Sequence, residues 1–207
     1  ISDSAMVVSA REESSSIGLE ILKKGGNAFD AMMATEMALA VSYPFAGNLG
    51  GGGFMVYRKA NGETGSLDYR EKAPLASSKT MYLDEEGNVI SEKSKLGGLA
   101  VGVPGTVAGI FAVHEKMGSM SVGEILKPVI ALAKRGFVVT EKQSKTLANY
   151  RDLFLKENKD TILFAKPYKK GDTIKNVQLA KTLERIVANG REEFYSRETG
   201  KIMIEYL

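Results

Sequence analysis

The sequence predicts an α+β fold or a layered α/β/α arrangement, and three observations support this. Apolar residues recur with helical spacing in some segments and alternate as in strands in others. Two strand-like stretches flank Asn61-Gly62, a pair typical of a hairpin turn, which favours antiparallel pairing. No low-complexity linker or internal repeat interrupts the 207 residues. We therefore expect residues 1–207 to form a single domain.

The N-terminal segment predicts a strand followed by a helix. AMVVSA, residues 5–10, has the apolar character of a short buried strand. Residues 13–26, ESSSIGLEILKKGG, place Ile17, Leu19, Ile21 and Leu22 on an apolar side. Gly25-Gly26 is typical of the residues that follow a helix C-terminus. We expect this helix to end there.

A second helix is predicted over residues 27–43, NAFDAMMATEMALAVSY. Asn27 is a suitable N-cap, and Asp30 follows three residues later, as in a capping box. The interior of this helix is almost wholly alanine, methionine, leucine and valine. We therefore expect it to be buried on most sides, with its methionines, Met32, Met33 and Met37, filling the core.

The remainder of the chain predicts a hairpin and further helices. Residues 53–71 contain the two strands around Asn61-Gly62. Thr106 and Ser121 are candidate N-caps of two consecutive helices, each of which ends at a glycine. The predicted helices after the hairpin are residues 106–118, 121–136 and 177–190, followed by a helical tail from Arg191.

Composition excludes several classes of function. The net charge of +3 is spread along the chain without a basic block interleaved with aromatics, so we expect no nucleic-acid partner. No apolar run approaches the ~18 residues of a membrane span. The absence of cysteine excludes disulfides and thiol nucleophiles, and is compatible with a secreted or periplasmic location, although a cytoplasmic one stays open. With His114 as the sole histidine, a multi-histidine metal site cannot form, and His114 itself is expected to be a structural helix residue.

The stretch YPFAGNLGGGGFMVYR raises the question of what approaches its glycines, Gly47 and Gly50–Gly53. A phosphate cradle would require a glycine loop that follows a strand and opens a helix, or a Lys-Ser or Lys-Thr pair after the loop. Here the glycines follow a helix and open a strand instead. A close crossover of backbones is the better interpretation, and we expect Gly51 to need a positive φ.

Several stretches together resemble the γ-glutamyltranspeptidase family. They are GNAFDAMMATEMALAVSYPFAGNLGGGGFMVYR, LDYREKAP and GVPGTVAG, in the family's order and at about its separations. GSMSVGEILKPVIALAKRGFVVT and KKGDTIKNVQLAKTLERIVANGREEFY continue the likeness, so it covers nearly the whole chain. Residues 151–168 match less well.

The resemblance implies an N-terminal nucleophile hydrolase with a four-layer α-β-β-α sandwich. Members are made as one precursor that cleaves itself into a large and a small subunit. The N-terminal threonine of the small subunit attacks a γ-glutamyl amide, and its own α-amine is the base. Such chemistry needs no cofactor or metal. This chain corresponds to the N-terminal part of the large subunit, to be completed by a small subunit from the same precursor.

No threonine of this chain matches the start of the family's small subunit. The threonines considered are more simply packing residues or helix caps, and these are Thr35, Thr64, Thr106 and Thr140. We therefore expect no catalytic residue in this chain, and we expect Leu207 to be a cut-off rather than a capped helix end.

The resemblance assigns one substrate-binding residue. Arg70, in DYREKAP, matches the arginine that holds the α-carboxylate of the γ-glutamyl group. A guanidinium can hold a carboxylate through two parallel charge-assisted hydrogen bonds, which lysine cannot. The structural alternative is a surface ion pair with Asp68 or Glu71. Glu71 is expected to form a local pair with Arg70.

The resemblance implies cleavage of γ-glutamyl amides such as glutathione, with transfer of the acyl group to water or an amine. Relatives that act as cephalosporin or glutaryl acylases, or that depolymerise poly-γ-glutamate, remain alternatives because Arg70 would suit any substrate with that carboxylate. A homologue that no longer cleaves itself and acts as a binding or scaffold protein is an alternative of another class.

Overall fold

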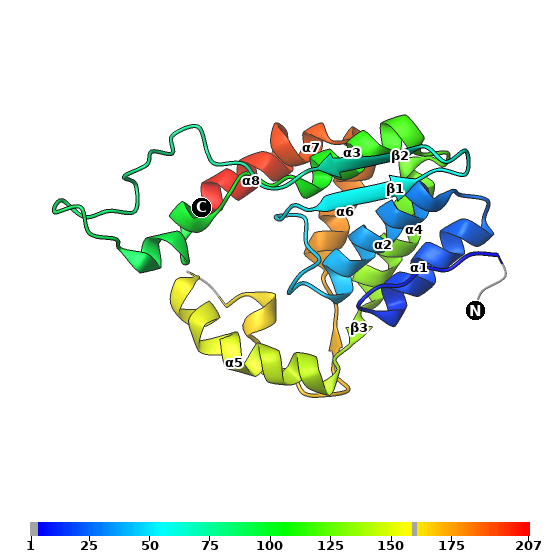
Figure 1. Cartoon of the computed structure of the whole chain (residues 1–207). Coiled ribbons are helices and arrows are strands. Elements are labelled where there is room, and N and C mark those ends of the chain that lie inside the picture. Colours follow the sequence, from blue (N-terminus) through cyan, green and yellow to red (C-terminus); the bar gives the residue numbers. More distant parts are fainter. Residues whose placement is uncertain (1–3, 159–160) are drawn as a thin grey trace.

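The polypeptide alternates helices with short antiparallel strand pairs, so the α+β prediction is confirmed. The computed structural model describes residues 4–158 and 161–207, and their path is shown in Figure 1. The helices are α1 (Glu12–Lys23), α2 (Ala28–Ser42), α3 (Thr106–Met117), α4 (Val122–Arg135), α5 (Glu141–Glu157), α6 (Val177–Asn189), α7 (Glu192–Tyr195) and α8 (Glu198–Tyr206). The strands are β1 (Phe54–Arg58), β2 (Thr64–Asp68), β3 (Phe137–Val138) and β4 (Thr173–Ile174), and 3₁₀ turns cover Ser91–Ser94, Gly98–Ala100 and Leu163–Ala165.

Helices α1 and α2 lie side by side and run antiparallel (Figure 1). Ser14 at the start of α1 and Ser42 at the end of α2 are joined by a hydrogen bond of 2.9 Å between their hydroxyls. Gly25, with a φ of +94°, follows the last turn of α1. The predicted glycine stop is therefore confirmed.

Helix α2 is the centre of the core, as its composition predicts. Met33 and Met37 are fully buried, whereas Met32 is only half-buried. Helix α4 packs against both α2 and α6. Helices α4 and α6 add further side chains to the core, including Ile125, Leu126, Val129, Leu132, Leu183 and Ile186.

The predicted capping box of α2 is present and also anchors a distant loop. The Asn27 side chain accepts hydrogen bonds from the first turn, and the Asp30 carboxylate accepts one of 2.9 Å from the Asn27 backbone. The same carboxylate accepts from the backbone N–H of Ser119 at 3.0 Å, from its hydroxyl at 2.5 Å, and from the backbone N–H of Met120 at 3.4 Å. Burial acts to raise the pKa of Asp30, but these hydrogen bonds outweigh it and hold the pKa below its usual value.

The two predicted caps after the hairpin have different outcomes. Ser121 caps α4, as predicted, and the structure adds a capping box with Glu124. The prediction for Thr106 is wrong, because Gly105 is the N-cap residue and no side chain caps α3. Thr106 is instead a buried residue of the first turn whose backbone N–H donates to the Gly51 carbonyl at 3.0 Å. This tertiary contact replaces the local cap.

Strands β1 and β2 form the predicted hairpin. Phe54 pairs with Asp68, and Arg58 pairs with Thr64. Gly62 supplies the positive φ, +88°, that the turn needs. On the half-buried face the hairpin approaches α2, where the ring of Tyr57 meets that of Phe29 edge-on at 5.7 Å. The other face is exposed.

The predicted buried strand at residues 5–10 is wrong for this chain. Residues 5–9 belong to no strand, and Met6 and Val8 are exposed. An apolar alternating segment needs both a neighbouring strand and a covering layer to be buried. Helix α1 covers one side of the segment, where Val7 is half-buried against Gly18, but within the described ranges residues 5–9 pair with no strand.

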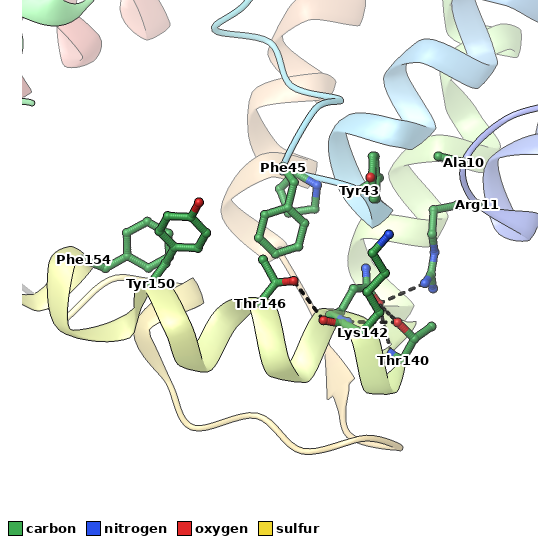
Figure 2. Close-up of a pocket in the computed structure, with 11 residues that line it drawn as sticks. Ala10, Arg11, Tyr43, Phe45, Thr140, Lys142, Thr146, Tyr150 and Phe154 are labelled. Atoms are coloured by element: carbon green, nitrogen blue, oxygen red, sulfur yellow. Dashed lines mark hydrogen bonds between the residues drawn. The ribbon is translucent and has the colours of Figure 1, made fainter. Parts of the chain in front are cut away.

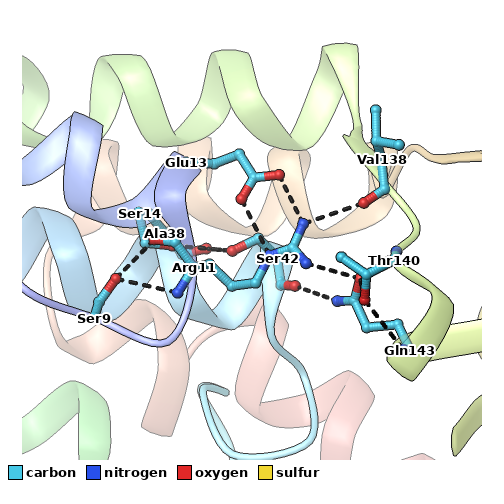
Figure 3. A network of polar contacts seen from close by, with 9 residues as sticks. All are labelled: Ser9, Arg11, Glu13, Ser14, Ala38, Ser42, Val138, Thr140 and Gln143. Carbon is cyan, nitrogen blue, oxygen red and sulfur yellow. Dashed lines mark hydrogen bonds and ion pairs between the residues drawn. The ribbon is translucent and has the colours of Figure 1, made fainter. Parts of the chain in front are cut away.

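Helix α5 is absent from the sequence predictions, and Arg11 helps to hold it in place (Figure 3). Arg11 donates to Glu13 at 2.7 Å, to the Gln143 side chain at 2.9 Å and to the carbonyl of Val138 at 3.1 Å. Gln143, in the first turn of α5, donates in turn to the carbonyl of Ser42 at 2.9 Å. One guanidinium thus joins the N-terminal segment, α1 and the start of α5.

The predicted helical tail is confirmed, but it is divided into α7 and α8. Glu193 of α7 is buried and its carboxylate accepts from Arg185 of α6 at 3.0 Å, from the Thr199 hydroxyl at 2.8 Å and from Asn189 at 3.0 Å. Burial acts to raise the pKa of Glu193, but these hydrogen bonds together lower it. The tail is therefore fastened to α6.

The segment from residue 72 to residue 105 extends away from the helices (Figure 1). Apart from two 3₁₀ turns it lacks regular structure, and Leu75, Val89 and Leu99 are exposed on it. Within residues 4–158 and 161–207, no helix is long and apolar enough to span a membrane.

Candidate functional site

Three of the sequence stretches that carry the family resemblance meet in one place. The carbonyl of Gly51 accepts hydrogen bonds from the backbone N–H groups of Gly105, at 2.8 Å, and Thr106. Tyr69, next to Arg70, donates its backbone N–H to the carbonyl of Gly53 at 2.9 Å. Lys72 and Val103 form an isolated antiparallel bridge. The glycine run, the segment around Arg70 and the start of α3 are therefore joined by their backbones.

The glycines at this junction allow backbones to touch, as predicted. A Cβ on Gly52 would lie 2.6 Å from the carbonyl oxygen of Tyr69 and 2.8 Å from the Cα of Arg70. A Cβ on Gly105 would collide with the same carbonyl, and one on Gly109 with the Tyr69 ring. These glycines fix the position of the backbone from which Arg70 projects.

The expectation that Gly51 needs a positive φ is wrong. Gly51 is absent from the glycines with positive φ among the residues that the structure describes. A Cβ there would meet only the side chain of Asn48, at 2.8 Å. Within the glycine run it is Gly52, not Gly51, whose position brings it close to another backbone.

Arg70 follows the end of β2 and projects its guanidinium away from the core. Its backbone N–H donates to the carboxylate of Asp68 at 2.9 Å, and this turn fixes the backbone. Its Nε lies 3.4 Å from a carboxylate oxygen of Glu71, and the guanidinium stands 5.7 Å from the centre of the Phe54 ring. The side chain is 63% exposed. Both predicted alternatives, a local pair with Glu71 and an available cation, coexist in this geometry.

The two terminal nitrogens of Arg70 donate to no other residue in the described part of the chain, because its only side-chain hydrogen bond uses Nε. These nitrogens form the end of the guanidinium that can grip a carboxylate bidentately. The long distance to Glu71 and its exposure make that pair weak. The arrangement can therefore present a cationic fork on a fixed backbone to an anionic group.

Tyr69 supports the backbone next to Arg70. Its ring packs against Gly53 and Gly109. Burial raises the pKa of the Tyr69 phenol, and the charge of Glu36 on α2 raises it further. Burial also raises the pKa of Glu36. The side chain before Arg70 thus anchors it, while Arg70 itself stays outside the core.

Sequence reasoning missed Phe54 and Tyr69 as supports of Arg70. Phe54 pairs with Asp68 in the hairpin, which places its ring beside the guanidinium. The available signal was the hairpin register, because strand pairing around Asn61-Gly62 brings the start of β1 next to the end of β2. For Tyr69 no sequence pattern indicates that two distant glycines make room for its ring.

The other candidates have structural positions. Thr35 donates to the carbonyl of Ala31 at 2.7 Å, Thr140 caps α5, and Thr64 begins β2. The Nε2 of His114 lies 2.8 Å from the carbonyl of Met120. Across the described ranges, no group of three or more histidine, cysteine, aspartate or glutamate residues could hold a metal ion.

Solved structures with the same chain path define the fold class. γ-Glutamyltranspeptidase from Pseudomonas nitroreducens matches with a TM-score of 0.93 and 43% identity over 100% of this chain and 61% of its own. The enzyme from Helicobacter pylori matches with a TM-score of 0.91 and 41% identity, over 99% of this chain and 60% of its own. The chain has the fold of the N-terminal nucleophile hydrolases.

The family follows from the sequence. The family model for gamma-glutamyltranspeptidase matches residues 14–207, and the chain belongs to this family. The glutathione hydrolase proenzyme of Escherichia coli is 45% identical over 92% of this chain, but the matched part is 33% of that protein. This chain therefore spans about a third of the length of the curated relative. The predicted resemblance is confirmed.

Proposed function

We propose that this chain is the large-subunit portion of a γ-glutamyltranspeptidase that cleaves γ-glutamyl amides such as glutathione. Residues 1–207 form a single domain fragment that a small subunit from the same precursor completes. Arg70 binds the α-carboxylate of the γ-glutamyl group, and this chain supplies no catalytic residue. The acyl group passes to water or to an amine acceptor.

The observation that carries this proposal is the state of Arg70. Its backbone is fixed by Asp68 and by close contact with Gly52, yet its two terminal nitrogens have no partner among the described residues. Arg11, which stabilises the fold, uses its terminal nitrogens on Glu13 and Gln143 instead. The backbone of Arg70 is held in place while the fork of its guanidinium stays available to a ligand that contributes a carboxylate.

The exposed face of the hairpin supports the need for a second subunit. Phe54 and Val56 project from β1 on the face away from α2, and both are largely exposed. An apolar sheet face is stable only when another layer covers it. Arg70 lies at the end of this face, so a covering subunit would enclose the guanidinium and bring its own groups to the bound substrate.

The proposed division of chemistry follows from the resemblance to the family, which places the nucleophile on the small subunit. The hydroxyl of the small subunit's N-terminal threonine attacks the γ-carbonyl carbon while its α-amine accepts the hydroxyl proton. The amide C–N bond then breaks, and the leaving amine takes that proton. Water or an acceptor amine attacks the resulting ester and regenerates the hydroxyl. Arg70 holds the far end of the glutamyl group throughout, which orients the carbonyl.

Two sets of alternatives remain. An acylase or a poly-γ-glutamate depolymerase of the same fold would use Arg70 in the same manner. A structure titled cephalosporin acylase, from Bacillus halodurans, matches this chain at 25% identity with a TM-score of 0.80, well below the identities of the γ-glutamyltranspeptidases. A scaffold protein without self-cleavage is the alternative of another class. For location we propose secretion or the periplasm, which the lack of cysteine permits.

The first experiment tests for processing of the full-length protein. Expression should yield two fragments on a denaturing gel, and N-terminal sequencing of the smaller one should begin at threonine. A precursor that stays intact and hydrolyses no γ-glutamyl anilide would contradict the proposal in favour of a scaffold protein.

The second experiment tests Arg70 in the processed protein. Arg70→Lys keeps the charge but loses the bidentate grip, so we expect KM for a γ-glutamyl anilide to rise by about 10- to 100-fold. Self-cleavage should be unchanged. Arg58→Lys, at an exposed position on the same hairpin, is the matched control and should leave KM unchanged. An unaltered KM in Arg70→Lys would show that Arg70 does not bind the substrate.

A further inference from the structure

A groove between α5 and the loop after α2 has no role in the function proposed above (Figure 2). Its volume is about 820 Å³. One wall is a face of α5, and the other is formed by Tyr43, Pro44 and Phe45. Arg70 is not among its lining residues. The groove is therefore distinct from the carboxylate-binding position proposed for this chain.

The charge in this groove is positive and is concentrated at one end. Arg11 and Lys142 line it there, and its lining includes no aspartate or glutamate. Arg11 is already paired with Glu13 at 2.7 Å. Lys142 forms no ion pair in the described part of the chain, and the adjacent Glu141 is engaged by Lys145 at 2.9 Å. Lys142, which points toward the Tyr43 wall in Figure 2, is the available cation.

The opposite end of the groove is aromatic. Tyr150 and Phe154 stack with ring centres 6.2 Å apart. On the facing wall Phe45 and Tyr43 meet edge-on at 6.2 Å, and Tyr43 lies toward the Lys142 end (Figure 2). Within the described ranges the hydroxyls of Tyr43 and Tyr150 form no hydrogen bond to another residue. The rings of Tyr43 and Tyr150 each offer an apolar surface with a hydroxyl at the edge, a combination enriched at protein interfaces.

The length of the groove distinguishes between possible ligands. Lys142, Thr146, Tyr150 and Phe154 follow one another at intervals of four residues, so they form a stripe along one face of α5. At 1.5 Å per residue the stripe is roughly 18 Å long. An extended peptide of about five or six residues covers that length. A compact aromatic acid would contact only one end.

We propose that this groove binds an extended peptide segment with a carboxylate at one end and an apolar side chain four or five residues away. The carboxylate pairs with Lys142, and the apolar side chain packs on Tyr150 and Phe154. The tyrosine hydroxyls and Thr146 face the backbone amides between these two ends.

The test measures binding of a labelled peptide to the processed full-length protein by fluorescence polarisation. The probe is fluorescein-labelled Asp-Ala-Thr-Ala-Leu-Leu, and its mate replaces Asp with Lys. We expect saturable binding of the first peptide and binding at least about fivefold weaker for the second. Lys142→Glu should weaken binding of the acidic peptide by about tenfold and strengthen binding of its mate. Tyr150→Ala should weaken both by about fivefold.

Matched variants separate the groove from general effects. Lys145→Glu makes the same charge change on α5 outside the groove, and Leu155→Ala truncates a side chain that does not line it. Both should bind the acidic peptide as the parent protein does. Equal losses in Lys142→Glu and Lys145→Glu, or no saturable binding to the parent protein, would overturn the proposal. Dodecanoate as competitor should displace the peptide weakly, whereas complete displacement at equal concentration would assign the groove to acyl chains. Because binding is measured without hydrolysis, the outcome is independent of Arg70.

Discussion

The helical body and the hairpin with its following loop differ in how far they bury their apolar side chains. Helices α1, α2, α4 and α6 bury large apolar residues completely, for example Ile21, Met33 and Leu183 at 0% exposure. The hairpin and the loop leave Val56 at 84% and Leu75 fully exposed. The helical body buries its large apolar side chains within the described chain, whereas the hairpin region leaves its own exposed. This difference is what the covering subunit proposed above would account for.

The charged groups repeat this contrast. The carboxylates of Asp30 and Glu193 are buried in the helical body, and each accepts hydrogen bonds from several donors. Arg70, in the hairpin region, has one long side-chain hydrogen bond to Glu71. Charges that hold the fold are fully engaged, whereas the charge assigned to ligand binding is left available. The distinction helps to separate structural from functional residues.

The largest effect is expected at Gly52, where the glycine run that follows α2 contacts the backbone around Arg70. Gly52→Val would place a Cβ within 2.8 Å of backbone atoms of Tyr69, Arg70 and Glu71, none of which can rotate away. We expect a loss of about 3 kcal/mol in the free energy of unfolding, measured with urea. Gly51→Val is the control, because its Cβ meets only the Asn48 side chain. Equal losses in the two variants would contradict the assigned contact.

A smaller effect is expected in the helical body. Asp30→Ala leaves the backbone N–H groups of Ser119 and Met120 without their acceptor, and we expect a loss of about 2 kcal/mol. Glu63→Ala, which removes an exposed ion pair with Lys59 on the hairpin, should cause no measurable change in urea unfolding.

The Asp30 carboxylate also predicts a dependence on pH. Its pKa is lower in the folded protein than in the unfolded chain, so its contribution is present above the unfolded value and is lost as the pH falls through the folded value. The free energy of unfolding, measured with urea, should therefore fall below about pH 4, and it should fall more in the parent protein than in Asp30→Asn. Parallel pH profiles for the two proteins would show that Asp30 does not carry this dependence.

A small effect on the stability of this chain is also expected at Val56. Val56→Ser replaces an exposed apolar side chain, so unfolding of this chain should change little. In the full-length protein the same change should reduce processing or subunit association, which size-exclusion chromatography can measure. A variant that is fully processed and associated would show that the hairpin face is not part of the subunit interface.

Local signals predicted the parts of the fold that depend on local contacts. The capping pair of Asn27 with Asp30 spans three residues, and Ser121 directly precedes its helix, so the sequence alone indicates both caps. The hairpin turn at Asn61-Gly62 is equally local. The Thr106 prediction failed because a distant carbonyl, that of Gly51, occupies the start of α3.

The errors elsewhere have the same origin. Helix α5 was missed because it is mostly polar and buries only Gln143 and Leu147, although Thr140 and Gln143 carried a capping signal. Residues 5–10 carry the pattern of a buried strand, but burial depends on neighbours outside the segment. Arg70 was identified by resemblance, whereas its supports, Phe54 and Tyr69, depend on strand register and on distant glycines.

The phenol of Tyr195 donates to the carbonyl of Pro104 at 2.8 Å and accepts from the backbone N–H of Ala108 at 3.0 Å. This residue of α7 therefore closes the turn that adjoins the Arg70 loop, from about ninety positions later in the chain. During synthesis the hairpin and its helices emerge long before that phenol does. The turn reaches its final form only after Tyr195 has left the ribosome, so maturation of this region is a late event in folding.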